Sequence, residues 1–557
     1  MTGSVYAAFG ETVKHHPDED FLCILPETAG RYAIESGTYS YRQAAQIVGE
    51  LRGRYAAAGL RPGQRAGLLL ENRPDMFFHW FALNGLGVSV VPINSEWRQA
   101  ELEFLVGHSE IGVAVAPRGR EQQLRQAAAD CGRRLIVTPP DLSGLSPAPE
   151  AREAARISET QEVALASATR EAAPARTTEC ALLYTSGTTG RPKGCVLTNE
   201  YFLCAGDWYI NAGGLCTVRP GRDRLLTPLP MTHMNAMAFS TLAMVLTGGC
   251  IVPLDRFHPG TWWSTVRLSR ATIVHYLGVM PAMLLSAPPE SGDRQHTVRF
   301  GFGAGVSPRL HAGFEARFGF PLLEAWAMTE TGAGAVIIAN REPRKVGTAC
   351  FGRAASDIDY RIVTDHGGDA PVGEPGELWV RARGAQPRRG FFREYLKDSP
   401  ATEAAWEGGY FHTGDIVFVD PDGDLHFVDR KKNVIRRSGE NISAVEVESV
   451  ILQHPQVAGV GVTAVPDEIR GDEVMACVIA RPGLGAAAHM ELAVELVEFC
   501  KERLAYFKAP GYVVFCRELP LTPTAKIQRA RLKELGRTML GASDAIDLRH
   551  LKKRSTP

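Results

Sequence analysis

Apolar and polar positions along the first third of the chain switch repeatedly between helical and strand spacing. Apolar residues three or four positions apart predict one face of a helix: Ala44, Val48, Leu51, Tyr55 and Ala58. The segments that follow predict strand, helix, strand, helix and strand in turn, at 65–70, 74–87, 88–93, 101–110 and 111–117. Such alternation is typical of parallel strands covered by helices.

The pattern weakens between residues 118 and 179, where Ala, Pro, Arg and Glu dominate, and we expect a variable, partly mobile connection there. Beyond it, 227–249 predicts a loop that enters a buried helix, and 271–285 predicts a strand, a turn and a helix. After about Ser356 the segments shorten and turns multiply, which predicts a small β-rich subdomain. The stretch after Arg430 forms a unit of its own, with a helix at 441–455, strands at 457–467 and 474–480, and a helix whose apolar stripe is Ala493, Leu496, Cys500 and Leu504.

Composition narrows the class of protein. The 557 residues include 61 Lys and Arg against 62 Asp and Glu, so the net charge is −1, which argues against a nucleic-acid binder. No stretch is apolar enough to span a bilayer, and the N-terminus shows no signal peptide. The 11 cysteines are scattered without CxxC pairs, as is typical of reduced thiols, so we expect a cytoplasmic protein.

The chemically most informative segment is YTSGTTGRPKG, residues 184–194, which lies between two short apolar runs that predict strands. Its glycines let successive N–H groups face inward and cradle an anion, and hydroxyls and a lysine add further donors. The loop positions that supply these groups are Thr185, Ser186, Gly187, Thr188, Thr189, Gly190 and Lys193. The pattern favours a polyphosphate ligand, with a flexible linker as the alternative. It is not a Walker P-loop, because Lys193 is followed by glycine.

This segment resembles the phosphate loop of the acyl-adenylate-forming (AMP-binding) superfamily, which includes acyl-CoA synthetases, luciferases and the adenylation domains of peptide synthetases. The resemblance extends from about Phe21 to Leu535. It implies a mixed α/β fold with a large N-terminal adenylation domain (1–430) of parallel α/β layers plus the β-rich subdomain. A small mobile α+β C-terminal domain (431–557) would follow, with Lys432 as the hinge. The implied cofactors and cosubstrates are ATP, Mg²⁺ and coenzyme A.

Two further segments resemble family signatures of the nucleotide site. WAMTETG, from Trp326, implies that Thr329 binds phosphate and that Glu330, with Thr185, holds Mg²⁺, a cation that favours oxygen ligands. Trp326 would pack on the adenine beside Ala325. A threonine helix cap with an acidic first turn is the alternative for this segment. GFGAGVSP, with Gly303, Ala304 and Gly305, would let the backbone approach the adenine, unless it is a plain turn from strand to helix.

The later signatures imply the remaining site residues. Asp415 in HTGD would accept hydrogen bonds from the ribose hydroxyls, with an aspartate in a turn as the alternative. Arg430 would pair with ribose or α-phosphate. Lys526 would bridge carboxylate and phosphate oxygens during adenylation, unless it is a surface lysine. His233 would gate the acyl pocket or be structural. We expect the neighbouring Lys431, Arg436 and Arg437 to form a solvated basic run.

The function that this resemblance implies is an acid–thiol ligase that converts a carboxylic acid, ATP and coenzyme A to acyl-CoA, AMP and pyrophosphate. Residues 227–249 are also weakly similar to crotonobetaine/carnitine-type CoA ligases. Two alternatives are transfer to a separate carrier protein, for which the basic segment 381–397 is a candidate docking surface, and a nucleotide-binding scaffold without turnover. The sequence leaves the acid and a homodimer open; the candidate pocket walls are Trp208, His233, Tyr276, Gly278, Gly303 and Ala325, with Met231, Met234 and Met237 as wall or core and Met244 as core.

Overall fold

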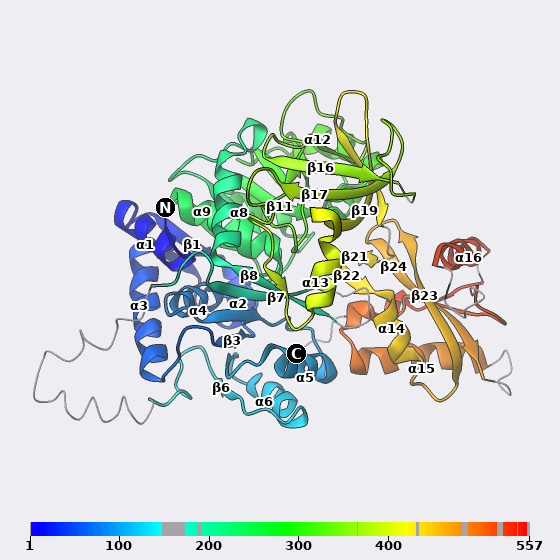
Figure 1. Ribbon diagram of the computed structural model, residues 1–557, viewed down its shortest axis with the longest axis horizontal. Coiled ribbons are helices and arrows are strands. Elements are labelled where there is room, and N and C mark those ends of the chain that lie inside the picture. Colours follow the sequence, from blue (N-terminus) through cyan, green and yellow to red (C-terminus); the bar gives the residue numbers. More distant parts are fainter. Residues whose placement is uncertain are drawn as a thin grey trace, which may run out of the picture.

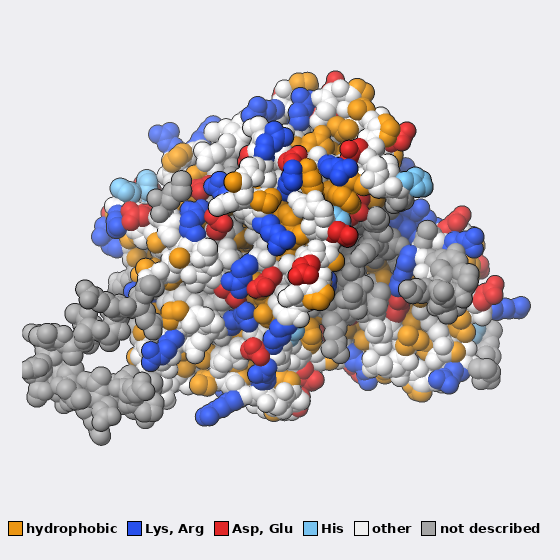
Figure 2. Space-filling model, viewed as in Figure 1, with side chains coloured by type: hydrophobic (Ala, Val, Ile, Leu, Met, Phe, Trp, Pro, Cys, Tyr) orange, Lys and Arg blue, Asp and Glu red, His pale blue; other side chains and the backbone are white. Residues whose placement is uncertain are grey.

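The protein is described here by a computed structural model, which covers residues 2–147, 173–185, 192–364, 366–430, 434–481, 488–520, 527, 529–542 and 544–553. Two α/β layers and a β-rich subdomain form the larger part, and the segments coloured orange to red form a smaller unit beside it (Figure 1). Basic and acidic side chains are interspersed on the face shown in Figure 2. Within the described ranges, no helix is both long and apolar enough to cross a membrane.

The first layer is a seven-stranded sheet in the order β18-β8-β7-β4-β3-β5-β6. Its strands β3 to β7 pair in parallel, whereas β8 and β18 add antiparallel. The strands are β3 (Arg65–Leu68), β4 (Ser89–Pro92), β5 (Val113–Val115), β6 (Ile136–Thr138), β7 (Glu179–Thr185), β8 (Lys193–Thr198) and β18 (Glu394–Tyr395). The helices that accompany them are α3 (Tyr41–Ala57), α4 (Pro74–Asn84), α5 (Gln99–Ser109) and α6 (Glu121–Asp130). The predicted alternation is confirmed, but the expectation of an irregular chain from residue 118 is wrong for α6 and β6, where Leu124 and Val137 are buried.

The second layer is an eight-stranded sheet in the order β14-β13-β12-β11-β9-β10-β1-β2, and it is parallel from β13 to β1. Its strands are β1 (Asp20–Ile24), β2 (Gly37–Ser40), β9 (Arg224–Thr227), β10 (Cys250–Pro253), β11 (Ile273–Leu277), β12 (Phe300–Ala304), β13 (Leu322–Trp326) and β14 (Ile337–Ile338). The helices are α1 (Val5–His15), α2 (Pro26–Tyr32), α8 (Asn199–Asn211), α9 (Thr241–Thr247), α10 (Trp262–Ser269), α11 (Val279–Ser286) and α12 (Pro308–Phe318), and a π-helix spans Asn235–Ser240. Because α4 is apolar on every side, it is buried, and Trp80 packs on Phe202 of α8 with ring centroids 5.2 Å apart.

The β-rich subdomain is a five-stranded antiparallel sheet, as the short segments after Ser356 predict. Its order is β15-β20-β19-β17-β16, with strands β15 (Cys350–Gly352), β16 (Ile358–Val363), β17 (Gly376–Ala382), β19 (Phe411–Val419) and β20 (Leu425–Arg430). Helix α13 (Ser399–Ala405) follows β18, which returns the chain from this subdomain to the first sheet.

The C-terminal unit, the described residues from 434 to 553, has its own six-stranded sheet and its own apolar core. Its elements are β21 (Val434–Arg437), β22 (Glu440–Ser443), α14 (Ala444–Ile451), β23 (Val457–Asp467), β24 (Gly471–Ala480), α15 (His489–Arg503), β25 (Tyr512–Phe515), α16 (Arg529–Gly541) and β26 (Ile546–Asp547). The helix predicted from residue 441 begins later, at Ala444. Ser443 caps it by accepting a hydrogen bond from the Glu446 N–H, so the three residues before the helix remain in β22.

The C-terminal unit touches the larger part through a buried ion pair. Lys508 Nζ donates to Glu101 Oε1 of α5 at 2.5 Å and to Glu446 Oε1 of α14 at 2.9 Å. Burial disfavours the charged ammonium, but the two carboxylates outweigh it and raise the pKa of Lys508. Trp97 packs against apolar clusters on both sides of the contact.

Candidate active site

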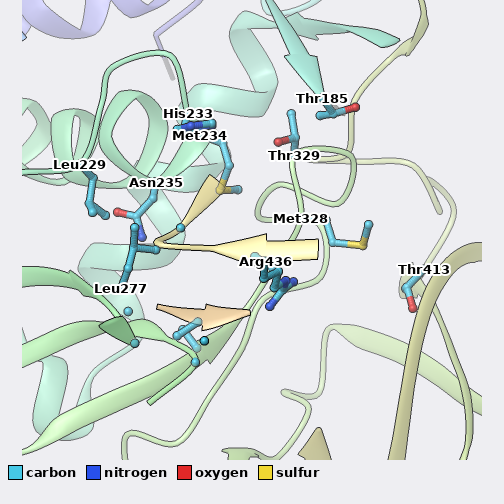
Figure 3. Close-up of a pocket in the computed structure, with 18 of the residues that line it drawn as sticks. Thr185, Leu229, His233, Met234, Asn235, Leu277, Met328, Thr329, Thr413 and Arg436 are labelled. Carbon is cyan, nitrogen blue, oxygen red and sulfur yellow. The ribbon is translucent and has the colours of Figure 1, made fainter. Parts of the chain in front are cut away.

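A cavity of about 1170 Å³ lies where three parts of the molecule meet. The second sheet contributes the carboxyl ends of β11 and β12 and the segment that follows β13, which is the edge where parallel α/β sheets usually hold ligands. Thr185 and Lys193 come from the first sheet, and the turn around Gly439 comes from the C-terminal unit. Thr185, Thr329 and Thr413 lie on one side of the view in Figure 3, and Leu229, Asn235 and Leu277 lie on the other.

The predicted phosphate end is built around Glu330. Thr185 is the last residue of β7 and Lys193 is the first residue of β8. The two residues are paired in register, so the predicted phosphate loop connects them. Its residues Ser186, Gly187, Thr188, Thr189 and Gly190 lie outside the described residues. Glu330 is 7% exposed, and its Oε1 accepts hydrogen bonds from Thr185 Oγ1 at 3.4 Å and from the Tyr395 hydroxyl at 3.0 Å.

Tyr395 was not anticipated from the sequence. Its segment, 381–397, is predicted as a basic docking surface. In the structure, β18 pairs with β8 and places Tyr395 against Lys193, whose Nζ lies 4.5 Å from the ring centroid. Burial and the Glu330 carboxylate raise the pKa of Tyr395, so its hydroxyl stays protonated and donates. The sequence around Tyr395 carries no usable signal for a strand, because β18 contains only Glu394 and Tyr395.

The oxygen atoms of Glu330 and Thr185 suit a magnesium ion. Mg²⁺ in proteins is often held by one or two carboxylates while substrate phosphates and water complete its coordination. The two side chains touch each other and both line the cavity beside Thr329, so they fit that pattern. In the part of the chain that is described, no group of three or more His, Cys, Asp or Glu could form a metal cage without the substrate.

The predicted adenine loop lines the cavity as expected from its glycines. Gly303 and Ala304 end β12 on the cavity wall, and Gly305 follows them. A Cβ on Gly303 would lie 2.2 Å from the Tyr276 carbonyl oxygen. Buried Glu324 fixes the loop by accepting hydrogen bonds from the N–H groups of Gly305 at 2.9 Å and Val306 at 3.2 Å.

The predicted ribose residues lie just behind this wall. The Trp326 indole N–H donates to Asp415 Oδ2 at 2.8 Å, and both side chains are buried. Ala325 and Ala327 line the cavity on either side of Trp326. Arg430 is paired in register with Asp415 at the end of β20.

The other end of the cavity is apolar. Its wall contains Leu229, Met234, Phe239, Leu277, Phe302 and Val336, together with the amide of Asn235. Of the wall residues expected from the sequence, His233, Gly278, Gly303 and Ala325 line the cavity. Trp208 instead supports it from behind, 5.5 Å from Phe239 and 6.2 Å from Phe302 between ring centroids, and Tyr276 is buried. Met231, Met237 and Met244 are core residues.

The C-terminal unit closes the cavity with the turn between β21 and β22. Gly439 has φ 89°, and a Cβ there would lie 2.1 Å from Leu277 Cδ1. Next to it, Glu440 Oε2 lies 3.6 Å from Nε2 of His233. The expectation of a solvated basic run is wrong for Arg437, which is 3% exposed and donates from Nε to Glu473 Oε2 at 2.7 Å. Arg436 is exposed and lines the cavity; Lys431, the predicted hinge Lys432 and Lys526 lie outside the described residues.

Comparison with solved structures supports the fold. The o-succinylbenzoate CoA synthetase of Bacillus subtilis, a double mutant bound with a product analogue, matches with a TM-score of 0.75 at 24% identity over 95% of this chain and 98% of that chain. The same enzyme in complex with AMP gives 0.61, at 24% identity over 94% and 98%. The chain therefore matches the structure with the product analogue at the higher TM-score. A malonyl-CoA ligase bound to methylmalonyl-CoA and AMP gives 0.71, at 24% identity over 90% and 97%.

Comparison of the sequence identifies the family. Crotonobetaine/carnitine–CoA ligases of Shigella sonnei (strain Ss046) and Escherichia coli O8 (strain IAI1) are each 32% identical over 502 residues, which is 89% of this chain and 93% of theirs. The family model described as AMP-binding enzyme matches residues 9–395, and that of the AMP-binding enzyme C-terminal domain matches 446–526. The predicted resemblance, fold class and enzyme class of an AMP-forming acyl-CoA ligase are confirmed, and the chain belongs to the AMP-binding enzyme family.

Proposed function

We propose that the protein activates a carboxylic acid with ATP and transfers the acyl group to coenzyme A. In the first half-reaction a carboxylate oxygen bonds to the α-phosphorus and pyrophosphate leaves. In the second, the thiol sulfur bonds to the acyl carbon, its proton is lost and AMP leaves. The observation that carries this proposal is one continuous cavity that joins Thr185, Thr329 and Glu330 to an apolar pocket and is closed by the C-terminal unit.

The phosphate end supplies groups for the charge that accumulates between two anionic reactants. Thr185, Thr329 and Lys193, with the loop residues Ser186 to Gly190, would bind phosphate oxygens. Glu330 and Thr185 would hold Mg²⁺, which neutralises phosphate charge when bound. Lys526 would complete this set during adenylation. Each of these roles follows from the family resemblance. The hydrogen bonds that Glu330 accepts from Thr185 and Tyr395 support the roles proposed for Thr185 and Glu330.

The nucleoside would bind on the opposite wall. Gly303, Ala304, Gly305 and Ala325 would face the adenine, and Trp326 would support it. Asp415 and Arg430 would bind the ribose or the α-phosphate. We further propose a boundary between residues 430 and 431, with Lys432 as the hinge, because the C-terminal unit has a separate core. A cytoplasmic location and a homodimer stay predictions of the sequence.

Coenzyme A is favoured over a carrier protein because the relatives of this chain are CoA ligases, and part of segment 381–397 is buried. Arg381 is paired with Asp359, Phe391 and Phe392 are buried in the main core, and Tyr395 belongs to the cavity. Part of the segment therefore has a structural role, but Arg383, Arg388, Arg389, Arg393 and Lys397 are exposed, so the docking surface for a carrier stays an alternative.

The proposed function is tested by supplying a panel of carboxylic acids with ATP, Mg²⁺ and either coenzyme A or a carrier protein. We expect AMP and pyrophosphate to appear in equal amounts with acyl-CoA when coenzyme A is present. Formation of AMP only with the carrier protein would contradict the choice of acceptor. Absence of pyrophosphate with every acid would favour the scaffold alternative.

A further inference from the structure

The apolar end of the cavity contains one amide, that of Asn235, the first residue of the π-helix Asn235–Ser240. In Figure 3 it lies on the same side of the view as Leu229 and Leu277, away from Thr185 and Thr329. Apart from His233, whose Nε2 lies 3.6 Å from Glu440 Oε2, the described side chains around this end are aliphatic, aromatic or thioether groups. A polar group on such a wall usually has a partner, in the protein or in the ligand.

The amide is held from behind by buried His275. His275 Nδ1 lies 2.6 Å from Asn235 Oδ1, and Nε2 lies 2.9 Å from the hydroxyl of Tyr209. Ser240 Oγ lies 2.9 Å from the same Nδ1 and also donates to the Asn235 carbonyl oxygen at 3.3 Å. His275 is fully buried, and burial lowers its pKa to about 3, so the ring is neutral and carries one N–H.

One assignment of protons gives the two hydroxyl donors and the imidazole donor of this group an acceptor. Tyr209 donates its hydroxyl proton to Nε2, so the single imidazole N–H is on Nδ1 and donates to Asn235 Oδ1. With the opposite tautomer, the buried Tyr209 hydroxyl proton would have no acceptor among the described residues, which is costly. The Asn235 oxygen therefore faces His275, and its Nδ2 is left with two N–H groups for the cavity.

We propose, on the basis of the function proposed above, that Asn235 selects carboxylic acids whose acyl chain carries a neutral hydrogen-bond acceptor, a carbonyl or hydroxyl oxygen. Nδ2 has no hydrogen-bond partner within the described ranges, so an acid with such an oxygen satisfies it and a plain hydrocarbon chain leaves it unpaired. A cationic acyl group is disfavoured, because the amide presents positive N–H dipoles. The acidic residues on the described cavity wall, Glu330, Glu377, Asp467 and Glu468, belong to other segments of the chain, and the Glu440 carboxylate lies 3.6 Å from His233 Nε2.

The test compares kcat/KM for straight-chain acids with that of their keto and hydroxy analogues of equal length, and for trimethylammonium acids. We expect the best keto or hydroxy acid to exceed its plain counterpart at least about tenfold. In Asn235→Leu this ratio should fall to about one. Asn235→Asp, which removes the donors and adds a negative charge, should shift the preference towards trimethylammonium acids.

Two further variants separate selection from general damage. Met234→Leu changes a neighbouring wall residue without touching the hydrogen bonds, so the ratio should be retained. Tyr209→Phe removes the hydroxyl that fixes the tautomer of His275, so the ratio should fall part of the way while the circular dichroism spectrum and melting temperature show whether the variant folds. A loss of the ratio in Met234→Leu equal to that in Asn235→Leu would overturn the proposal.

The result also distinguishes this proposal from the function on which it rests. Equal kcat/KM for plain and acceptor-bearing acids, or a wild-type preference for trimethylammonium acids, overturns the role of Asn235 and leaves the ligase function standing. Failure of every acid to yield AMP overturns the ligase function, and this proposal with it.

Discussion

At the scale of single residues, Glu330 is held by two hydroxyl donors rather than by a cation, which leaves its charge available for a metal. We predict that Glu330→Ala raises the Mg²⁺ concentration needed for half-maximal activity by about tenfold or more, because the proposed carboxylate ligand is lost. The measurement is the rate of pyrophosphate release across a Mg²⁺ titration. Tyr395→Phe is the matched control: it removes one hydroxyl that orients the carboxylate and should have a smaller effect. An unchanged Mg²⁺ dependence in Glu330→Ala would remove this residue from the metal site.

Gly439 is a second residue at which both the backbone conformation and the neighbouring side chain favour glycine. Its φ of 89° favours glycine, and any side chain there meets Leu277 of the larger part. We predict that Gly439→Leu prevents the C-terminal unit from closing the cavity as seen here. Thioester formation from supplied acyl-adenylate and coenzyme A should then fall at least about tenfold, while pyrophosphate release during adenylation is retained.

The control for that variant is Gly373→Leu. Gly373 has φ 86°, but a Cβ there would meet open space, so it reproduces the backbone strain without the collision. Equal damage by the two variants would mean that strain, and not closure of the cavity, explains the loss.

His233 and Glu440 give the closed arrangement a dependence on pH. Burial of the imidazole opposes its charging, but the Glu440 carboxylate, 3.6 Å from Nε2, outweighs it and raises the pKa of His233. A raised pKa means that the pair stabilises the closed arrangement fully below the ordinary value of about 6.5, and that this contribution is lost as pH rises through the raised pKa. We predict that, in single-turnover experiments, the rate of the thioester half-reaction relative to that of adenylation falls as pH rises through this interval.

The matched variant for this prediction is Glu440→Gln, which keeps the shape and removes the charge that raises the pKa of His233. Its ratio of the two half-reaction rates should change less with pH through the same interval. A profile identical to that of the wild-type protein would show that the pair does not couple closure to pH.

At the scale of elements, the sequence predicts what depends on local pattern. The strands β7 and β8 on either side of the phosphate loop follow from the apolar runs at 181–183 and 195–197, and α4 follows from Pro74 and its continuous apolar face. Strand β18 could not be predicted, because it has two residues and exists through its pairing with β8. Elements α6 and β6 were missed because a polar, Ala- and Arg-rich composition concealed Leu124 and Val137.

Helices α5 and α14 meet at Lys508, and this contact holds the two parts of the molecule together. Only Glu101 of the three charged residues belongs to the larger part. We predict that Glu101→Gln weakens closure by about 1.5–3 kcal/mol, the range for a hydrogen bond to a charged group, while Lys508 keeps Glu446. The thioester half-reaction should slow in single-turnover experiments, and adenylation should not.

A control for this contact exists at the end of the same helix. Glu110 pairs with Lys397 at 3.1 Å and with Arg133 at 2.9 Å, but these partners are exposed and all belong to the larger part. Glu110→Gln should leave both half-reactions within about twofold, since exposed pairs contribute about 0–1 kcal/mol. Loss of adenylation in Glu101→Gln would show that Glu101 supports folding and not closure.

At the scale of the whole molecule, the site depends on contacts that no local pattern contains. Lys508 and Glu101 are 407 positions apart in the sequence, and the contacting residues His275 and Asn235 are 40 positions apart. The family signatures predict which residues would surround the nucleotide, and of these the structure brings Thr185, Thr329 and Glu330 together in one cavity. The signatures could not show that Arg437 is buried against Glu473 or that Gly439 abuts Leu277, because both depend on how the C-terminal unit folds and packs.

We expect the two half-reactions of the proposed function to use different parts of the C-terminal unit. Here the turn at Gly439 and the segment 466–471 face the cavity, whereas Ile527, which follows the predicted catalytic Lys526, packs in the C-terminal unit's own cluster with Leu532 and Met475. This chain also matches the structure with a coenzyme A product analogue better than the AMP complex of the same enzyme. We therefore infer that this arrangement belongs to the second half-reaction and that Lys526 acts in a different one.

We predict that Lys526→Ala lowers pyrophosphate release in adenylation by about 100- to 1,000-fold, the loss typical for a group that stabilises charge in the transition state. Thioester formation from supplied acyl-adenylate should be spared, because that step uses the arrangement described here. Lys526→Ala and Gly439→Leu should thus fail in opposite half-reactions, and each serves as the control for the other. If Lys526→Ala slows both half-reactions equally, the lysine supports the site as a whole, and the division of labour between two faces of the C-terminal unit is refuted.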